Sequence, residues 1–199
     1  SGRRLDSFGL PGNMKEYLDY RIANFISYWE KRADVDDDMI PALSPWYGIA
    51  EHTAFIGGEA EFGELTSWHH PFIKDWEKDR PKACLDESNT WLRLVLDGLT
   101  YIAEKADGRF AVKLRGGEGA MDIANIARGN DIFYDFFEYP DEIHEFLDFC
   151  AKAARFTLTK QAEIAGTYLG GIITGFDIWL PGNSTGHLSE DASVMISPE

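Results

Sequence analysis

The sequence has few cysteines, few basic side chains and no long apolar run. Its two cysteines, Cys84 and Cys150, are too few for the disulfide framework of a small secreted scaffold. The 19 lysines and arginines are outnumbered by 34 acidic side chains, and the net charge of -15 disfavours nucleic acid and anionic membrane surfaces as partners. No apolar run approaches the roughly 20 residues that cross a bilayer, and the N-terminus lacks the layout of a signal peptide. We expect a soluble, cytoplasmic protein.

Motifs that bind nucleotides or metals are also missing. Neither a G-x-G-x-x-G turn nor a P-loop follows a predicted strand, which argues against the usual nucleotide-binding folds. No Cys-x-x-Cys or His-Glu-x-x-His spacing occurs, and the side chains of the adjacent His69 and His70 should diverge. We therefore predict no metal site within these residues. Cys150 lies on the apolar stripe of a predicted helix, and we expect it to be a core residue.

What is present is the composition of one globular core. Hydrophobic residues make up 44% of the 199 positions and aromatic residues 14%, enough for a single domain to bury a sizeable interior. Ser1 and Gly2 resemble a cloning remnant. At the other end, Ser197, Pro198 and Glu199 have the order of a capping residue, a first-turn proline and an acid at a helix start. We expect residues 1–199 to form one incomplete domain that continues beyond Glu199.

Apolar residues recur at helical spacing over several segments, and capping residues mark their ends. Asn13 and Glu16 have the spacing of a capping box before a helix that reaches Trp29, whose aromatic face leaves room for a homodimer contact. Further helices are predicted over about 90–106 (capped by Asn89), near 120–128, from about Asn130, and over about 140–166. The residues expected to end these helices are glycines: Gly108, Gly129 and Gly166.

Short apolar segments between the helices are typical of strands, at 39–43, 110–114 and 168–174. Strands that alternate with helices indicate a parallel sheet, either open and doubly wound or closed into a (β/α) barrel. Because nucleotide-binding turns are missing, we favour an α/β fold that forms part of a (β/α)8 TIM barrel, which takes about 250 residues when complete. An aromatic-rich excursion over about 44–86 interrupts the pattern, and we expect it to cover a site.

Working residues of such a barrel lie at the carboxyl ends of the strands. After the second predicted strand come Arg115, Gly116 and Gly117, where a forked guanidinium beside exposed backbone suits a carboxylate ligand. The alternative is a structural ion pair of Arg115 with Asp122 or another acid. Glu51 and His52, adjacent in sequence, are a further acid and base candidate, although adjacency does not fix their geometry.

The loop after the third predicted strand is dense in polar and aromatic groups. Its candidates are Asp177, Trp179, Asn183, His187, Glu190 and Asp191. Glu190 and Asp191 could act as general acid and base, with solvated surface charge or helix capping as the alternative. His187 could be a proton shuttle or a metal ligand, with a hydrogen-bonding spacer as the alternative.

Four stretches of the second half carry recognisable motifs in order. They are Arg-Gly-Gly to Met-Asp (115–122), Arg-Gly-Asn to Tyr-Asp (128–135), Tyr-Pro-Asp-Glu-Ile-His to Leu-Asp-Phe (139–149), and Gly-His-Leu-Ser-Glu-Asp-Ala-Ser to Ser-Pro-Glu (186–199). Together they cover about 110–199 and resemble the uroporphyrinogen decarboxylase family, in which an acidic loop often leads into Ser-Pro-Glu.

The resemblance implies a (β/α) barrel enzyme with one of two chemistries. One is cofactor-free decarboxylation of uroporphyrinogen in tetrapyrrole biosynthesis, and the other is methyl transfer involving a corrinoid, usually to a zinc-activated thiol. The early Arg-Gln-Ala-Gly-Arg signature of the decarboxylases is absent, and Asn125 and Asp191 stand where a decarboxylase usually has Tyr and Ser. We therefore favour corrinoid-linked methyl transfer, with decarboxylation as the alternative.

The resemblance further implies a tetrapyrrole or corrinoid substrate, or a corrinoid protein as partner, and zinc ligands beyond Glu199. On this interpretation Arg115, with Gly116, Gly117, Asn125, Asp177 and Trp179, binds the ligand, while Asp191 orients or protonates the reacting centre together with Glu190 and His187. Two other classes stay open. One is a glycoside hydrolase barrel with Glu190 or Asp191 as a catalytic carboxylate and Trp179 as a sugar platform, and the other is a ligand-binding relative without chemistry.

Overall fold

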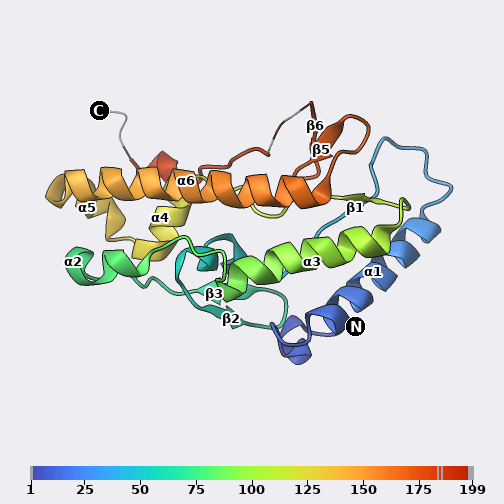
Figure 1. Cartoon of the computed structure of the whole chain (residues 1–199), viewed down its shortest axis with the longest axis horizontal. Coiled ribbons are helices and arrows are strands. Elements are labelled where there is room, and N and C mark those ends of the chain that lie inside the picture. The colour runs from blue at the N-terminus through green and yellow to red at the C-terminus, as the bar shows by residue number, and fades with distance from the viewer. Residues whose placement is uncertain (1, 183, 185, 197–199) are drawn as a thin grey trace.

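Helices dominate the structure, and the longest of them pack against one another (Figure 1). The computed structural model describes residues 2–182, 184 and 186–196, without the side chain of His52. Its helices are α1 (Met14–Lys31), α2 (Trp76–Asp79), α3 (Thr90–Ala106), α4 (Ala120–Arg128), α5 (Ile132–Glu138) and α6 (Pro140–Ala165). Single 3-10 turns are η1 (Leu5–Phe8), η2 (Ala50–His52), η3 (Ala54–Ile56), η4 (Arg80–Lys82) and η5 (Ala192–Met195). Within the described residues, none of the helices combines the length and apolarity needed to span a bilayer.

Parallel pairing brings the carboxyl ends of three short strands together. β1 (Ala42–Leu43) pairs with β4 (Ala111–Val112), and a parallel bridge between Lys113 and Ile173 adds β5 (Gly171–Ile173) at the other edge of β4. β6 (Trp179–Pro181) returns antiparallel along β5. The three predicted strands are therefore confirmed at shorter lengths, and the fold is α/β. Closure into a barrel stays a prediction.

The helix starts follow the expected capping residues only in part. Asn89 Oδ1 accepts the N–H groups of Trp91 and Leu92 at 2.9 and 3.1 Å, which confirms the cap of α3. The capping box at Asn13 is wrong, because in the described structure its side chain caps nothing and Glu16 instead pairs with Arg3 at 2.8 Å. A charge-assisted bond to a distant cation here replaces the local one.

At two further helix ends the capping residue lies one position away from the expected one. The short helix α5 does not use Asn130 as its cap but begins at Ile132, directly after Asp131. Helix α3 ends at Ala106 as predicted, but its C-cap is Asp107 rather than Gly108, and Asp107 itself adopts the left-handed conformation at φ 45°. Gly129 and Gly166 follow α4 and α6 as predicted.

The core is built where α3, α4 and α6 meet. Leu92 and Leu96 of α3 pack with Ile123 of α4 and with Phe146 and Cys150 of α6. Cys150 is fully buried, as predicted, and burial raises the pKa of its thiol far above the usual range. A thiol in this setting is an apolar core group rather than a nucleophile or a metal ligand. The predicted apolar stripe of α1 forms a second cluster with α3 through Leu18 and Ile22.

The excursion between β1 and α3 is ordered and folds back onto the helices. Besides η2, η3, α2 and η4 it holds the hairpin of β2 (Ala60–Phe62) and β3 (Ser67–His69). The side chains of His69 and His70 diverge as expected, since His70 faces solvent beside Glu61 while His69 packs inward. The inward ring fits only because residue 58 is glycine: a Cβ there would lie 1.2 Å from His69 Nε2.

The half-buried His69 ring, whose Nε2 atom is enclosed, predicts a loss of stability in mild acid. Burial lowers the pKa of His69 from 6.5 to about 4, and Nε2 has no hydrogen-bond partner among the described residues. The unfolded chain therefore binds this proton below pH 6.5 and the folded chain only below about 4, so the stability contributed by the neutral ring is lost as the pH falls through that window. We expect a loss of about 2 kcal/mol. Urea unfolding at pH 7 and pH 4.5 measures it.

The matched substitutions use the neighbouring histidine. His69→Gln should remove this part of the pH dependence, whereas His70→Gln, on the exposed face, should keep it. An unchanged pH dependence in His69→Gln would assign the acid sensitivity to other groups.

Candidate functional site

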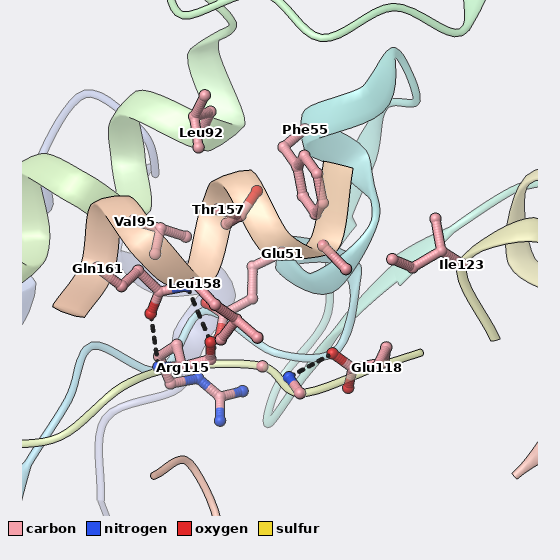
Figure 2. A pocket seen from close by; sticks show the side chains of 13 residues that line it. Glu51, Phe55, Leu92, Val95, Arg115, Glu118, Ile123, Thr157, Leu158 and Gln161 are labelled. Atoms are coloured by element: carbon pink, nitrogen blue, oxygen red, sulfur yellow. Dashed lines mark hydrogen bonds and ion pairs between the residues drawn. The ribbon is translucent and has the colours of Figure 1, made fainter. Parts of the chain in front are cut away.

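A small pocket lies at the carboxyl end of β4, between the loop that follows this strand and helices α3 and α6 (Figure 2). Its volume is about 30 Å³, room for one or two water molecules. The apolar wall is Phe55, Leu92, Val95, Ile123, Ala154 and Leu158; the polar groups are Glu51, Arg115, Glu118, Thr157 and Gln161, and Gly116 and Gly117 complete it. Phe55 and Glu51 come from the excursion, so this segment covers one side of the pocket.

A buried ion pair forms the polar end of the pocket. Arg115 Nε donates to Glu51 Oε1, and the two side chains are 9% and 4% exposed. Glu51 Oε2 also accepts the N–H of Tyr47 at 2.8 Å, and the Arg115 guanidinium lies 4.4 Å from the ring centroid of Trp46. The structural ion pair considered for Arg115 is thus present, with Glu51 rather than Asp122 as partner. Ligand binding by Arg115 stays a prediction.

The two glycines after Arg115 let another part of the chain approach closely. Gly116 and Gly117 have φ of 79° and 140°, which side-chain-bearing residues rarely adopt. A Cβ at Gly117 would lie 3.1 Å from the carbonyl oxygen of His187 and 3.2 Å from the Phe176 ring. The loop after β5 therefore passes directly over the loop after β4, as the strand-end rule predicts.

His187 lies at this crossing. Its ring packs against Phe176 with the centroids 4.6 Å apart, and its Nδ1 atom is buried without a hydrogen-bond partner in the part of the chain described. The backbone carbonyl of His187 thus lies beside Gly117 of the pocket.

Glu190 and Asp191 anchor the loop to helix α4. Glu190 Oε2 accepts the N–H of Met121 at 3.1 Å in the first turn of α4. In return, Asp122 of α4 accepts the N–H groups of Asp191 and Ala192 at 3.0 and 2.6 Å. Two carboxylates thus cap the start of each other's segment. Asp191 is exposed and its carboxylate accepts the hydroxyl of Ser189 at 2.9 Å.

Removing the Asp122 carboxylate should loosen the loop that it holds, at residues 186–196. We expect Asp122→Ala to destabilise the protein by about 1 kcal/mol, because two N–H groups at η5 lose their acceptor. Limited proteolysis should then cut faster within residues 186–196, while Asp141→Ala, in the first turn of α6, should leave this region unchanged. Equal cleavage in both variants would show that the hydrogen bonds accepted by Asp122 do not hold the loop.

The other predicted ligand-binding residues lie away from this pocket. Asn125 donates to the carbonyl of Gly129 at 3.3 Å within the end of α4. Asp177 accepts from Lys113 Nζ at 2.6 Å, and Trp179 Nε1 donates to the carbonyl of Tyr168 at 3.0 Å. Asp177 and Trp179 line a separate groove against α1. Asn183 lies outside the described residues.

Gln161 is the site residue that sequence reasoning missed. It lies on the buried face of α6, and its amide binds the backbone of Arg115 through two hydrogen bonds. A polar side chain on an otherwise apolar helical stripe was the available signal, because a buried amide needs hydrogen-bond partners.

The described residues around Arg115 form neither a zinc site nor a corrinoid pocket. No group of three or more His, Cys, Asp or Glu side chains that could hold a metal ion occurs in the described part of the chain. A pocket of about 30 Å³ is also far below the roughly 300 Å³ at which small-molecule pockets begin. We therefore derive no reaction step through zinc or a corrinoid.

The fold and the site define an α/β protein with a pocket at the end of a parallel strand. No known family model matches the sequence, and no curated protein matches it. Among solved structures, a methyltransferase from Methanosarcina mazei is similar, with a TM-score of 0.51 and 20% identity over 63% of this chain and 37% of that one. The chain thus spans little more than a third of that methyltransferase, and the two share a fold over the matched part.

Proposed function

We propose that this chain is part of a (β/α) barrel enzyme of the uroporphyrinogen decarboxylase family that acts in corrinoid-linked methyl transfer in the cytoplasm. The observation that carries the proposal is the likeness in fold to part of a methyltransferase. The motifs over 110–199 support the same family from the sequence. The substrate in this proposal is a corrinoid, either free or carried by a partner corrinoid protein.

In this proposal the residues around the pocket bind and orient the ligand. Arg115 presents a cation at the end of β4 and attracts an anionic group of the ligand beside Glu51. His187 moves a proton at the crossing of the two loops, where its ring is held by Phe176. Glu190 and Asp191 hold the loop that carries His187, and Asp191 orients the reacting centre. A homodimer through the aromatic face of α1 belongs to the same proposal.

The test uses the natural full-length protein. Methylcobalamin as donor and mercaptoacetate as acceptor should give methyl transfer, followed by the change in the corrinoid absorption spectrum, and Arg115→Met should lower the rate at low mercaptoacetate. Decarboxylation of uroporphyrinogen or hydrolysis of a glycoside, with no methyl transfer, would overturn the proposal in favour of those activities. Ligand binding without any turnover would favour a non-catalytic relative.

A further inference from the structure

The backbone of Arg115 is held by a side chain from a distant helix. Gln161 Oε1 accepts the N–H of Arg115 at 2.6 Å, and Gln161 Nε2 donates to the carbonyl of Arg115 at 2.9 Å. The glutamine is 2% exposed and comes from the last two turns of α6. A side-chain amide offers one acceptor and a donor in one plane, as a peptide group does. Gln161 therefore satisfies both polar backbone groups of one residue.

Arg115 lies at the point where the strand pairing of β4 ends. The N–H of Lys113 donates to Leu43 at 3.1 Å and that of Leu114 donates to Ile173 at 2.9 Å. The N–H and carbonyl groups of the next residue, Arg115, bind Gln161 instead of a strand. Since Gly116 and Gly117 follow at once and restrict the backbone little, the direction in which Arg115 leaves the sheet is fixed from α6.

The guanidinium is held separately from the backbone. Glu51 and Trp46 contact the head of the side chain, while Gln161 holds its base (Figure 2). In Figure 2 Gln161 reaches the Arg115 backbone from the side of α6, and the guanidinium lies on the opposite side of that backbone. A small shift of the Arg115 backbone would move its guanidinium relative to a bound ligand.

We infer that Gln161 is a positioning residue, which sets the place of the Arg115 guanidinium at the pocket through two hydrogen bonds to the Arg115 backbone. The inference rests on the proposed function, because it takes Arg115 as the group that binds the anionic ligand. Gln161 itself does not touch the reacting atoms in this assignment.

The first experiment measures the backbone directly. In the full-length protein, Gln161→Met keeps the length of the side chain and removes both hydrogen bonds. Hydrogen exchange of the amides in 113–117 should become at least about tenfold faster, because the Arg115 amide loses its acceptor. Thr157→Val, one turn away on the same helix and facing the same pocket, should leave exchange in 113–117 unchanged. Unchanged exchange in Gln161→Met would overturn the inference.

The second experiment is a double-mutant cycle on methyl transfer from methylcobalamin to mercaptoacetate. Gln161→Met should raise KM for mercaptoacetate by about tenfold with a smaller change in kcat, since a misplaced group can cost up to about a hundredfold. In the Arg115→Met background the same substitution should have no further effect on KM.

The outcomes separate the two proposals. If the effects of Gln161→Met and Arg115→Met multiply, Gln161 acts on overall structure and the inference is overturned, while the role of Arg115 stands. If Arg115→Met leaves KM and kcat at wild-type values, the proposed role of Arg115 fails, and the positioning role of Gln161 fails with it.

Discussion

Replacing Glu51 by glutamine should destabilise the protein by about 3 kcal/mol at pH 7. The Glu51 and Arg115 side chains are 4% and 9% exposed, so the substitution removes the negative charge that the Nε of a buried guanidinium binds. Removing one partner of a buried pair is costly because the remaining charge keeps its desolvation penalty and loses the compensating attraction. Urea unfolding, followed by far-UV circular dichroism, measures the change in the free energy of unfolding.

Two controls separate burial from ion pairing in general. Asp148→Asn breaks the pair of Asp148 with Lys152, whose side chains are 64% and 73% exposed, and should barely change stability. The double variant Glu51→Leu with Arg115→Met removes both buried charges and should be more stable than Glu51→Gln. A Glu51→Gln protein as stable as Asp148→Asn would mean that solvent reaches this pair.

Asp135→Asn should cost a similar amount, about 3 kcal/mol, at a second buried pair. Arg128 donates through Nε and Nη2 to the two oxygens of Asp135, at 2.7 and 3.0 Å, and Asp135 is 1% exposed. The same guanidinium donates through Nη1 to the carbonyls of Ile73 and Lys74 at 3.2 and 2.6 Å. The pair thus ties the excursion to the junction of α4 and α5, and hydrogen exchange at 72–76 should rise in the variant.

Asp131→Asn is the matched control for this prediction. Asp131 lies 3.9 Å from Nη1 of the same arginine, but its side chain is 69% exposed. The chemical change is identical and the guanidinium keeps Asp135, so stability should stay close to wild type. Equal losses in the two variants would contradict the importance of burial here.

The Arg128 and Asp135 pair also bears on the resemblance seen in the sequence. Both residues belong to one of the motifs that suggested the family, and the structure gives them a structural role away from the pocket. Glu190, in another of those motifs, caps a helix in this structure. Part of the motif content thus holds this fold together.

Helices were the most predictable part of the fold. The bounds of α3, α4 and α6 follow from apolar spacing and end residues that lie within the same segment, so the deciding interactions are local. The capping box at Asn13 failed for the opposite reason, because Arg3, which Glu16 pairs with, lies outside the helix. The strands are shorter than predicted, since their length depends on how far a neighbouring strand continues the pairing.

Only the part of the site formed by the strand ends was predictable from the sequence. The rule that strand ends carry working residues located Arg115 and the loop with His187 beside each other. The rule also grouped Asp177 and Trp179 with them, and the family resemblance added Asn125, yet these three side chains bind other partners outside the pocket. Side chains in one loop can face different directions, and spacing alone does not determine which.

The sequence by itself determined the composition of an acidic α/β protein, its helices, the order of its strands and the position of Arg115 after β4. Only the tertiary structure decided that Glu51 and Gln161 hold this arginine, one through its head and the other through its backbone. These contacts join residues 64 and 46 positions apart. Such partners depend on how η2 and α6 pack around β4, and packing between distant segments leaves no periodic signal in the sequence.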